Sequence, residues 1–395
     1  MVSQRAQEIA PFIVMDVLER AHELERQGEH IIHLEIGEPD FDTPEKIRQA
    51  GIEAIRRGAT HYTHSLGIPE LREAIAAYYA RRYRVNVSPE RVIVTMGTSP
   101  GLLLVLCSLL NPGDKVLVTD PCYACYPNFL HHVGAVACRV RLSPEDGFDV
   151  HPEALAEAMD PQTKAVIINS PANPTGKVLS AATLSAIAEL AESGLFIISD
   201  EIYHGLVYGT RDHTILEFTD RAFVINGFSK YFAMTGWRLG YVIAPPEFIR
   251  PMQKLQQNLF VCASSVSQWA GVAALTEHHP ELDEMVRTYD QRRRYMLKRL
   301  REIGFGIYSE PQGAFYVLAD ARHISKDSYR LAFDMLEKAR VAVAPGIDFG
   351  PGAEGFLRFS YANSLENIRI GLDRLQGFLR AEKRATQPAE AAPRT

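Results

Sequence analysis

Short runs of consecutive apolar residues recur through the middle of the chain, each followed by a stretch with helical character. Runs of this kind lie at residues 92–95, 115–119, 165–169, 195–199, 222–226 and 240–244. Because they lack alternation with polar residues, they are typical of strands buried on both faces, in a mainly parallel sheet covered by helices on each side. We therefore predict an α/β fold, with ligand-binding loops at the carboxyl ends of the strands.

The two ends of the chain show a different pattern. Apolar residues recur at helical spacing in residues 11–26, and good helix formers fill residues 44–57 and 69–82. A short strand is predicted at 30–36. Beyond residue 246 we predict helices at 248–275, 281–302, 328–340 and 365–382, with strands at 313–318, 341–343 and 356–360. This division predicts a large domain at 45–285, a smaller α+β domain built from 1–44 and 286–383, and a mobile tail at 384–395, rich in Ala, Pro and charge.

Composition narrows the functional classes. With 46% hydrophobic and 23% charged residues, the 395-residue chain is typical of a soluble globular protein. Its net charge of -6 gives no electrostatic reason to expect nucleic acid or an anionic membrane as a partner. It contains no apolar stretch long enough to span a bilayer and no secretory signal pattern, so we expect a cytoplasmic protein.

The five cysteines, an odd number, argue against a disulfide framework. Cys122 and Cys125 form a C-x-x-C pair, which leaves a zinc or redox role open. A structural zinc site usually shows a second such pair, so we interpret them as ordinary thiols and predict no metal.

Lys230 is the most informative single residue. It lies in the segment Asn-Gly-Phe-Ser-Lys that follows the run at 222–226, with Arg238 eight positions later. Apolar surroundings lower the pKa of an ammonium group, and a neutral amine can form a Schiff base with a carbonyl. The Arg238 guanidinium suits a phosphate. Taken alone, this pair is more often an ordinary surface lysine and arginine.

Other predicted strand ends carry complementary groups. Gly97, Thr98 and Ser99 stand before a helix, where backbone N–H groups bind anions. Tyr123, after residues 115–119, could stack on a planar ring or be a core tyrosine. Asn173 sits between two X-Pro bonds, either of which could be cis, in a stiff turn where its amide could donate a hydrogen bond.

A carboxylate and a second arginine complete the set. Asp200 ends a buried run, where it could pair with a protonated pyridine nitrogen or act as a helix N-cap, and Tyr203 follows it. Arg358 lies within an apolar strand, where it suits a substrate carboxylate. Together these groups match one planar, phosphorylated, carbonyl-bearing cofactor, pyridoxal phosphate.

The chain resembles the class I/II pyridoxal-phosphate-dependent aminotransferases of fold type I, closest to the aspartate aminotransferase-like branch. The resemblance runs from about residue 9 to 379. It rests on Ile-Gly-Glu-Pro-Asp-Phe at 36–41, Tyr62 with Gly67 and Arg72, Asn-Ser-Pro-x-Asn-Pro-Thr-Gly at 169–176, Ser-Asp-Glu-x-Tyr at 199–203, Ser-Lys through Gly-Trp-Arg-x-Gly at 229–240, and Arg-Phe-Ser at 358–360.

The resemblance implies a mostly parallel seven-stranded sheet between helices, and a ping-pong reaction that moves an amino group from an L-amino acid to a 2-oxo acid such as 2-oxoglutarate. It further implies that Lys230 holds the cofactor covalently and then carries a proton, that Asp200 pairs the ring nitrogen, and that a homodimer shares its active sites. The resemblance also implies that Tyr203 and Asn173 contact the ring 3-oxygen and that Tyr123 stacks on the ring. The cofactor phosphate would be bound by Gly97, Thr98, Ser99 and Arg238, and by Tyr62 of the neighbouring subunit. The substrate carboxylate would be bound by Arg358 with Asn173 and the Gly37 backbone.

Two positions depart from the family pattern. Gly227 stands where many relatives have a phosphate-binding serine, so Ser229 or the backbone would substitute. Ser99 stands where some aspartate-specific members have lysine, which weakens a prediction of an acidic substrate. A C–S lyase or decarboxylase on the same scaffold stays open as an alternative, and so does a non-catalytic sensor, against which Lys230 argues.

Overall fold

The computed structural model describes residues 1–386 and is built on a seven-stranded sheet with the strand order β2-β8-β7-β6-β5-β3-β4. Strand β8 is antiparallel to both of its neighbours, and the other pairs are parallel. The predicted α/β fold with a mostly parallel sheet is confirmed. The strands are β2 (Val92–Thr95), β3 (Lys115–Asp120), β4 (Val136–Arg141), β5 (Thr163–Asn169), β6 (Phe196–Asp200), β7 (Ala222–Gly227) and β8 (Gly240–Ile243).

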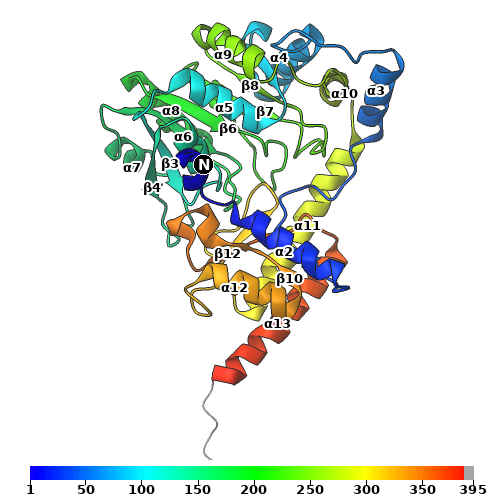
Figure 1. Cartoon of the computed structure of the whole chain (residues 1–395), viewed down its shortest axis with the longest axis vertical. Coiled ribbons are helices and arrows are strands. Elements are labelled where there is room, and N and C mark those ends of the chain that lie inside the picture. The colour runs from blue at the N-terminus through cyan, green and yellow to red at the C-terminus, as the bar shows by residue number, and fades with distance from the viewer. Residues whose placement is uncertain (387–395) are drawn as a thin grey trace, which may run out of the picture.

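Helices cover both faces of this sheet (Figure 1). Successive residues of one strand belong to different apolar clusters: Ile197 packs with one set of helices and Ile198 with the other. One set is α4 (Pro69–Tyr83), α8 (Ala181–Glu189) and α10 (Ser265–Thr276); the other is α5 (Thr98–Leu109), α6 (Tyr126–His132) and α9 (Pro246–Leu259). Burial of both faces explains why the strands read as continuous apolar runs.

Two parts of this region differ from the sequence predictions. Strand β4 was missed because it is an edge strand, in which Val140 alone is buried. The single helix predicted at 248–275 is wrong: α9 ends at Leu259, and Val261 adopts a φ of 67°. Helix α10 then begins anew, with the Ser264 hydroxyl accepting a hydrogen bond from the Ser267 N–H at 3.3 Å.

The lower part of the molecule in Figure 1 combines the two ends of the chain. Strand β1 (Ile32–His33) pairs in parallel with β10 (Val341–Ala342), so the strand predicted at 30–36 is much shorter. A second sheet has the antiparallel order β11 (Ala344–Pro345), β12 (Phe356–Ser360), β9 (Tyr316–Asp320). The helices here are α2 (Ile13–Arg26), α12 (Ser328–Asp334) with a π-helical turn (Met335–Ala339), and α13 (Leu365–Thr386). Helix α1 (Gln4–Glu8) lies instead beside α6 in the upper part, where Glu8 is 3.6 Å from His131.

The remaining α-helices of the described chain are α3 (Glu45–Arg56), α7 (Pro152–Glu157) and the long α11 (Pro280–Ile303), which runs from the upper part to the lower part (Figure 1). Residues 384–386, predicted as part of the tail, belong to α13, and the rest of that prediction lies outside the described residues. Within residues 1–386, no helix is both long and apolar enough to cross a membrane.

Candidate active site

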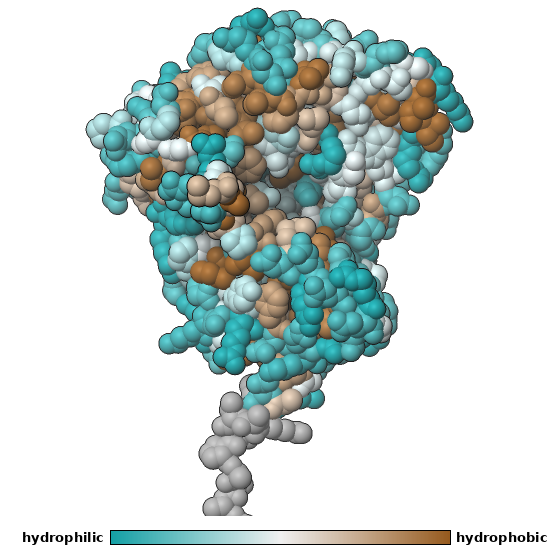
Figure 2. Space-filling model, in the orientation of Figure 1, coloured by the Kyte–Doolittle hydropathy of each residue, from teal (hydrophilic) through white to brown (hydrophobic). Residues whose placement is uncertain are grey.

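A cavity of about 410 Å³ lies where the carboxyl ends of β5, β6 and β7 face β9 and β12. On the side shown in Figure 2, the surface is hollowed where the upper and lower parts meet. The structure brings most of the predicted site residues together in its lining: Gly37, Thr98, Ser99, Tyr123, Asn173, Asp200, Tyr203, Lys230, Arg238 and Arg358.

Lys230 follows β7 and points into this cavity. Its Nζ donates a hydrogen bond to the Gly37 carbonyl at 2.6 Å. Burial, the main cause, together with the positive charges of Arg238 and Arg358 lowers the pKa of Lys230 to about 8, against the opposing charge of Glu38. At pH 7 about a tenth of this amine is therefore neutral, far more than for an exposed lysine.

Asp200, at the end of β6, is a carboxylate in the lining of the same cavity. Burial raises its pKa to about 6. The Tyr126 hydroxyl donates to Asp200 Oδ2 at 2.6 Å and the Ile202 N–H to Oδ1 at 3.2 Å. No helix begins at Asp200, because residues 202–205 form a turn, so the alternative interpretation as a helix N-cap is wrong. Tyr126 was not among the predicted site residues, although it lies three positions after Tyr123.

Two tyrosines meet on another wall. The hydroxyls of Tyr203 and Tyr316 lie 2.9 Å apart, and Tyr316 comes from β9, far along the chain. A Cβ at Gly37 would lie 2.2 Å from the Tyr316 hydroxyl oxygen, so this position admits glycine alone. The sequence analysis missed Tyr316 because nothing in its local pattern distinguishes it from a core residue.

Arg358 lies in β12 and is buried. Its Nη1 donates to Asn173 Oδ1 at 2.9 Å and its Nη2 to the Glu35 carbonyl at 2.5 Å. The guanidinium packs over the rings of Tyr316, at 4.2 Å, and Phe349, at 4.7 Å. Among the side chains that the structure describes, no carboxylate forms an ion pair with Arg358, and its Nε has no hydrogen-bond partner. A buried cation without a counter-ion is suited to binding an anionic ligand group.

The opposite end of the cavity is built for a second anion. Helix α5 begins at Thr98, and Gly97 offers no side chain to its free N–H groups. Arg238 has a φ of 51° and donates from Nη1 to the Thr235 carbonyl at 3.0 Å. A Cβ at Gly97 would lie 2.6 Å from Arg238 Nη2, so glycine lets the guanidinium approach this helix start.

Gly227 lies beside this anion site in a crowded stretch of β7. A Cβ there would lie 3.0 Å from both the Gly240 Cα and the Leu239 carbonyl oxygen, so a serine would require the neighbouring strand to shift. Ser229 instead lines the cavity. The two X-Pro bonds that flank Asn173 are both cis, and the Asn173 N–H donates to Asn169 Oδ1 at 2.8 Å.

Tyr62 is the one predicted site residue remote from the cavity, with 85% of its surface exposed. The Tyr123 ring packs edge-on against Tyr126, with centroids 5.3 Å apart. Cys122 is buried and Cys125 half-buried; in residues 1–386 no cluster of three or more His, Cys, Asp or Glu side chains is arranged to hold a metal.

Comparison with known proteins identifies the family. Residues 29–375 match the family described as aminotransferase class I and II. The chain belongs to this family. It is therefore an enzyme of the transferase class, and pyridoxal phosphate is the family's cofactor.

Individual relatives cover almost the whole chain. The (5-formylfuran-3-yl)methyl phosphate transaminase of Methanocaldococcus jannaschii is 44% identical over 96% of this chain and 100% of its own length. The aspartate/prephenate aminotransferase of Thermus thermophilus is 41% identical over 96% and 98%. A solved structure of the Thermus thermophilus aspartate aminotransferase with maleate has a TM-score of 0.91 at 39% identity, covering 95% of this chain and 99% of that one.

The cavity fits the family's cofactor on its own geometry. It offers an amine of lowered pKa, a buried carboxylate and an anion site at the start of α5. The Arg358 guanidinium, which forms no ion pair with a carboxylate among the described side chains, remains available for a substrate.

Proposed function

We propose that this enzyme transfers an amino group from an L-amino acid to a 2-oxo acid, with 2-oxoglutarate as acceptor, in two half-reactions of a ping-pong cycle. One observation carries the proposal: Lys230, an amine of lowered pKa, shares a cavity with Arg358, a buried guanidinium that has no counter-ion among the described side chains. Aminotransferase names of the relatives support the reaction type.

Pyridoxal phosphate supplies an electrophilic aldehyde and a ring that withdraws electrons from the substrate Cα. Lys230 is the residue to hold it covalently, and the neutral Lys230 amine is the base that takes a proton from the substrate Cα. Asp200, oriented by Tyr126, keeps a positive charge on the ring nitrogen. Tyr203 and Asn173 would hold the ring 3-oxygen by hydrogen bonds, and Tyr123 would stack on the ring.

Anion-binding groups at opposite ends set the orientation. The start of α5 (Gly97, Thr98 and Ser99) and Arg238 hold the phosphate. Arg358 holds the substrate α-carboxylate, assisted by Asn173 and the Gly37 backbone. Because the relatives named above act on different compounds, we leave the preferred donor to a substrate panel.

We further propose the domain division given above, with 45–285 as the large domain and 1–44 plus 286–383 as the small one. Closure of the small domain would exclude water from the cavity. We also propose a cytoplasmic homodimer in which Tyr62 binds the cofactor phosphate of the partner subunit. The exposed Tyr62 ring and its position outside its own cavity support this role.

The test uses the purified protein with pyridoxal phosphate, 2-oxoglutarate and a panel of L-amino acids. We expect stoichiometric glutamate and the matching oxo acid, and complete loss of turnover in Lys230→Ala. Lys298→Ala, at an exposed lysine on α11, is the matched control and keeps turnover. Release of pyruvate and ammonia without glutamate would refute the transaminase assignment in favour of a lyase. Full turnover in Lys230→Ala would refute both.

A further inference from the structure

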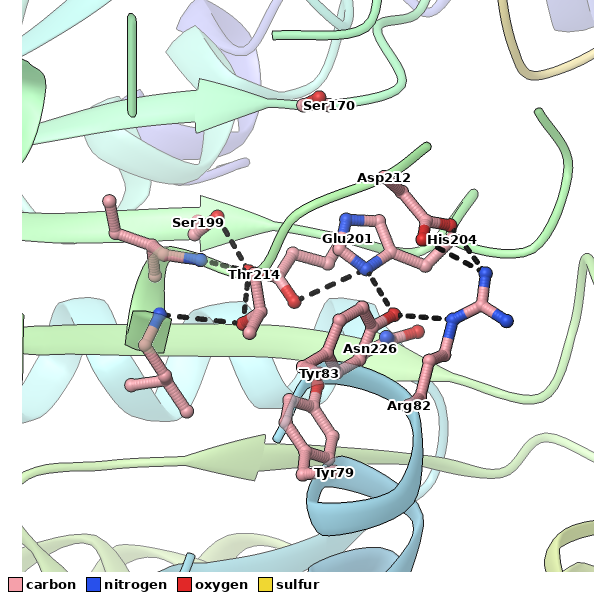
Figure 3. Close-up of polar contacts among 12 residues, drawn as sticks. Tyr79, Arg82, Tyr83, Ser170, Ser199, Glu201, His204, Asp212, Thr214 and Asn226 are labelled. Atoms are coloured by element: carbon pink, nitrogen blue, oxygen red, sulfur yellow. Dashed lines mark hydrogen bonds and ion pairs between the residues drawn. The ribbon is translucent and has the colours of Figure 1, made fainter. Parts of the chain in front are cut away.

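The turn after β6 has two chemically different sides. Asp200 and Tyr203 line the cavity. Glu201 and His204 lie in a second, buried polar cluster behind them, formed with side chains of α4 and of the loop that carries Asp212 (Figure 3). One short segment thus joins the proposed cofactor site to a group of titratable residues that has no part in the chemistry described above.

Glu201 is the centre of this cluster and is 1% exposed. Its Oε1 accepts three hydrogen bonds, from the Ser199 hydroxyl at 3.1 Å, the Thr214 hydroxyl at 2.9 Å and the Ile215 N–H at 3.0 Å. Its Oε2 accepts none in the described part of the chain and lies 3.5 Å from His204 Nδ1. All donors therefore converge on one oxygen, and the other is free to carry a proton.

The partners of His204 fix where its own proton sits. The Tyr83 hydroxyl lies 2.7 Å from His204 Nδ1 and accepts a hydrogen bond from Arg82 Nε at 3.0 Å. With Arg82 donating to the Tyr83 oxygen, the Tyr83 hydroxyl proton is available for His204 Nδ1. In this arrangement the imidazole is neutral and carries its proton on Nε2, which has no hydrogen-bond partner among the described residues.

The charges of the cluster balance only with one added proton. Asp212 and Glu201 are two carboxylates, and Arg82 is the one permanent cation, paired with Asp212 at 2.8 Å. The proton has to sit on His204 or Glu201 because a buried uncompensated charge is strongly unfavourable. The titratable and charged groups that face Glu201 from its own turn, from α4, from β8 and from the following loop are His204, Tyr79, Arg82, Tyr83, Tyr241 and Asp212.

His204 Nδ1 is engaged by the Tyr83 hydroxyl, whereas Glu201 Oε2 accepts no hydrogen bond among the described residues, so the added proton falls to Glu201. The pKa shifts agree with this assignment. Burial lowers the pKa of His204 to about 4, so the imidazole stays neutral. Burial raises the pKa of Glu201 to about 8, so the carboxyl group keeps its proton at pH 7.

We propose that Glu201 is a positioning residue of the active site: a neutral carboxylic acid that fixes the turn carrying Asp200 and Tyr203 and adds no charge behind Asp200. The effect of Glu201 on Asp200 matters only if Asp200 has the role at the cofactor ring nitrogen proposed above. Glu201 follows Asp200 directly in sequence, so an ionised Glu201 would place a second buried carboxylate on the other side of the same turn.

Infrared spectroscopy of the protein loaded with pyridoxal phosphate tests the protonation state directly. Comparison of unlabelled and ¹³C-glutamate-labelled protein at pH 7 should reveal the stretch of a protonated glutamate carboxyl group, lost in Glu201→Gln and titrating away near pH 8 in the native protein. Glu35→Gln is the control and should leave the band unchanged. Glu35 is 0% exposed but lies 2.7 Å from His33 Nδ1, and the pKa of His33 is raised to about 9, so this glutamate is paired with a cation.

The positioning role is tested by the affinity for pyridoxal phosphate. Glu201→Gln, which copies the neutral acid, should keep the dissociation constant within about threefold, whereas Glu201→Ala leaves three buried donors unsatisfied and should raise it at least about tenfold. Thermal unfolding confirms that each variant is folded. The neutral-acid assignment would be overturned if the infrared carboxyl band were absent, or if both substitutions weakened pyridoxal phosphate binding equally. The positioning role would be overturned if Glu201→Ala bound pyridoxal phosphate with native affinity. If the native protein bound no pyridoxal phosphate, the proposed function would fail while the infrared result stood.

Discussion

Replacing Tyr126 by phenylalanine removes one hydroxyl group from the wall of the cavity and leaves the ring in place. Tyr126 is 2% exposed, and its hydroxyl donates to Asp200 Oδ2 at 2.6 Å. A hydrogen bond to a charged group contributes about 1.5–3 kcal/mol, and the Ile202 N–H remains as a donor to the other oxygen. Without the hydroxyl, burial raises the pKa of Asp200 above its present value of about 6, so less of it is ionised at neutral pH.

An ionised Asp200 is what holds a positive ring nitrogen, so Tyr126→Phe should weaken binding of pyridoxal phosphate. Since about 1.4 kcal/mol corresponds to a factor of ten, we expect the dissociation constant to rise about 10- to 100-fold. Titration of apoprotein with the cofactor, followed by absorbance, measures it.

Tyr289→Phe is the matched control for this experiment. It also removes a hydroxyl that donates to a carboxylate, Asp40 at 3.3 Å, but outside the cavity lining. It should lower stability and leave cofactor affinity unchanged. Unchanged affinity in Tyr126→Phe would refute the argument that this hydroxyl supports Asp200.

Three further substitutions or titrations test other parts of the site. Arg358→Leu should raise KM for amino donors on the order of 100-fold, with an unchanged dissociation constant for pyridoxal phosphate, because the lost ion pair is with the substrate; steady-state kinetics and a cofactor titration together check this. Because the pKa of Lys230 is lowered to about 8, its reductive labelling by pyridoxal phosphate and borohydride in the apoprotein should rise with pH through a midpoint near 8, and a midpoint near 10.5 would contradict the shift. Gly97→Ala puts a Cβ 2.6 Å from Arg238 Nη2 and should weaken cofactor binding by on the order of tenfold, whereas Gly113→Ala, at a similar φ but with open space around it, should affect stability alone.

The sheet was predictable because its strands are buried on both faces, which leaves a strong signal in consecutive residues. Strand β4 gave no such signal, since an edge strand buries few of its residues. The break between α9 and α10 was hidden because Val261 and its neighbours continue the apolar spacing of a helix. Val261 adopts a left-handed φ at the end of α9, where its N–H donates to the Gln256 carbonyl at 2.8 Å, but it lacks the glycine or asparagine that usually marks such a helix end.

Site residues were predictable where they follow a strand directly, as Lys230 and Asp200 do. Tyr316 and Glu201 were not, for different reasons. Tyr316 reaches the cavity from a strand of the second sheet, and only the fold brings its hydroxyl to Tyr203. Glu201 stands inside a recognised motif, yet its environment depends on α4 and on the loop at residues 212–215, which are remote in sequence.

The pairing of β1 with β10 has a consequence for how the chain folds during synthesis. Ile32 leaves the ribosome early, but its partner Val341 follows only about 300 residues later. At roughly 5–20 residues per second, the N-terminal segment waits about 15–60 s for its partner strand. During that interval the seven-stranded sheet can form, whereas β1 presents an unpaired edge. The synthesis of β10 therefore sets the time at which the edge of β1 becomes paired and is protected from aggregation.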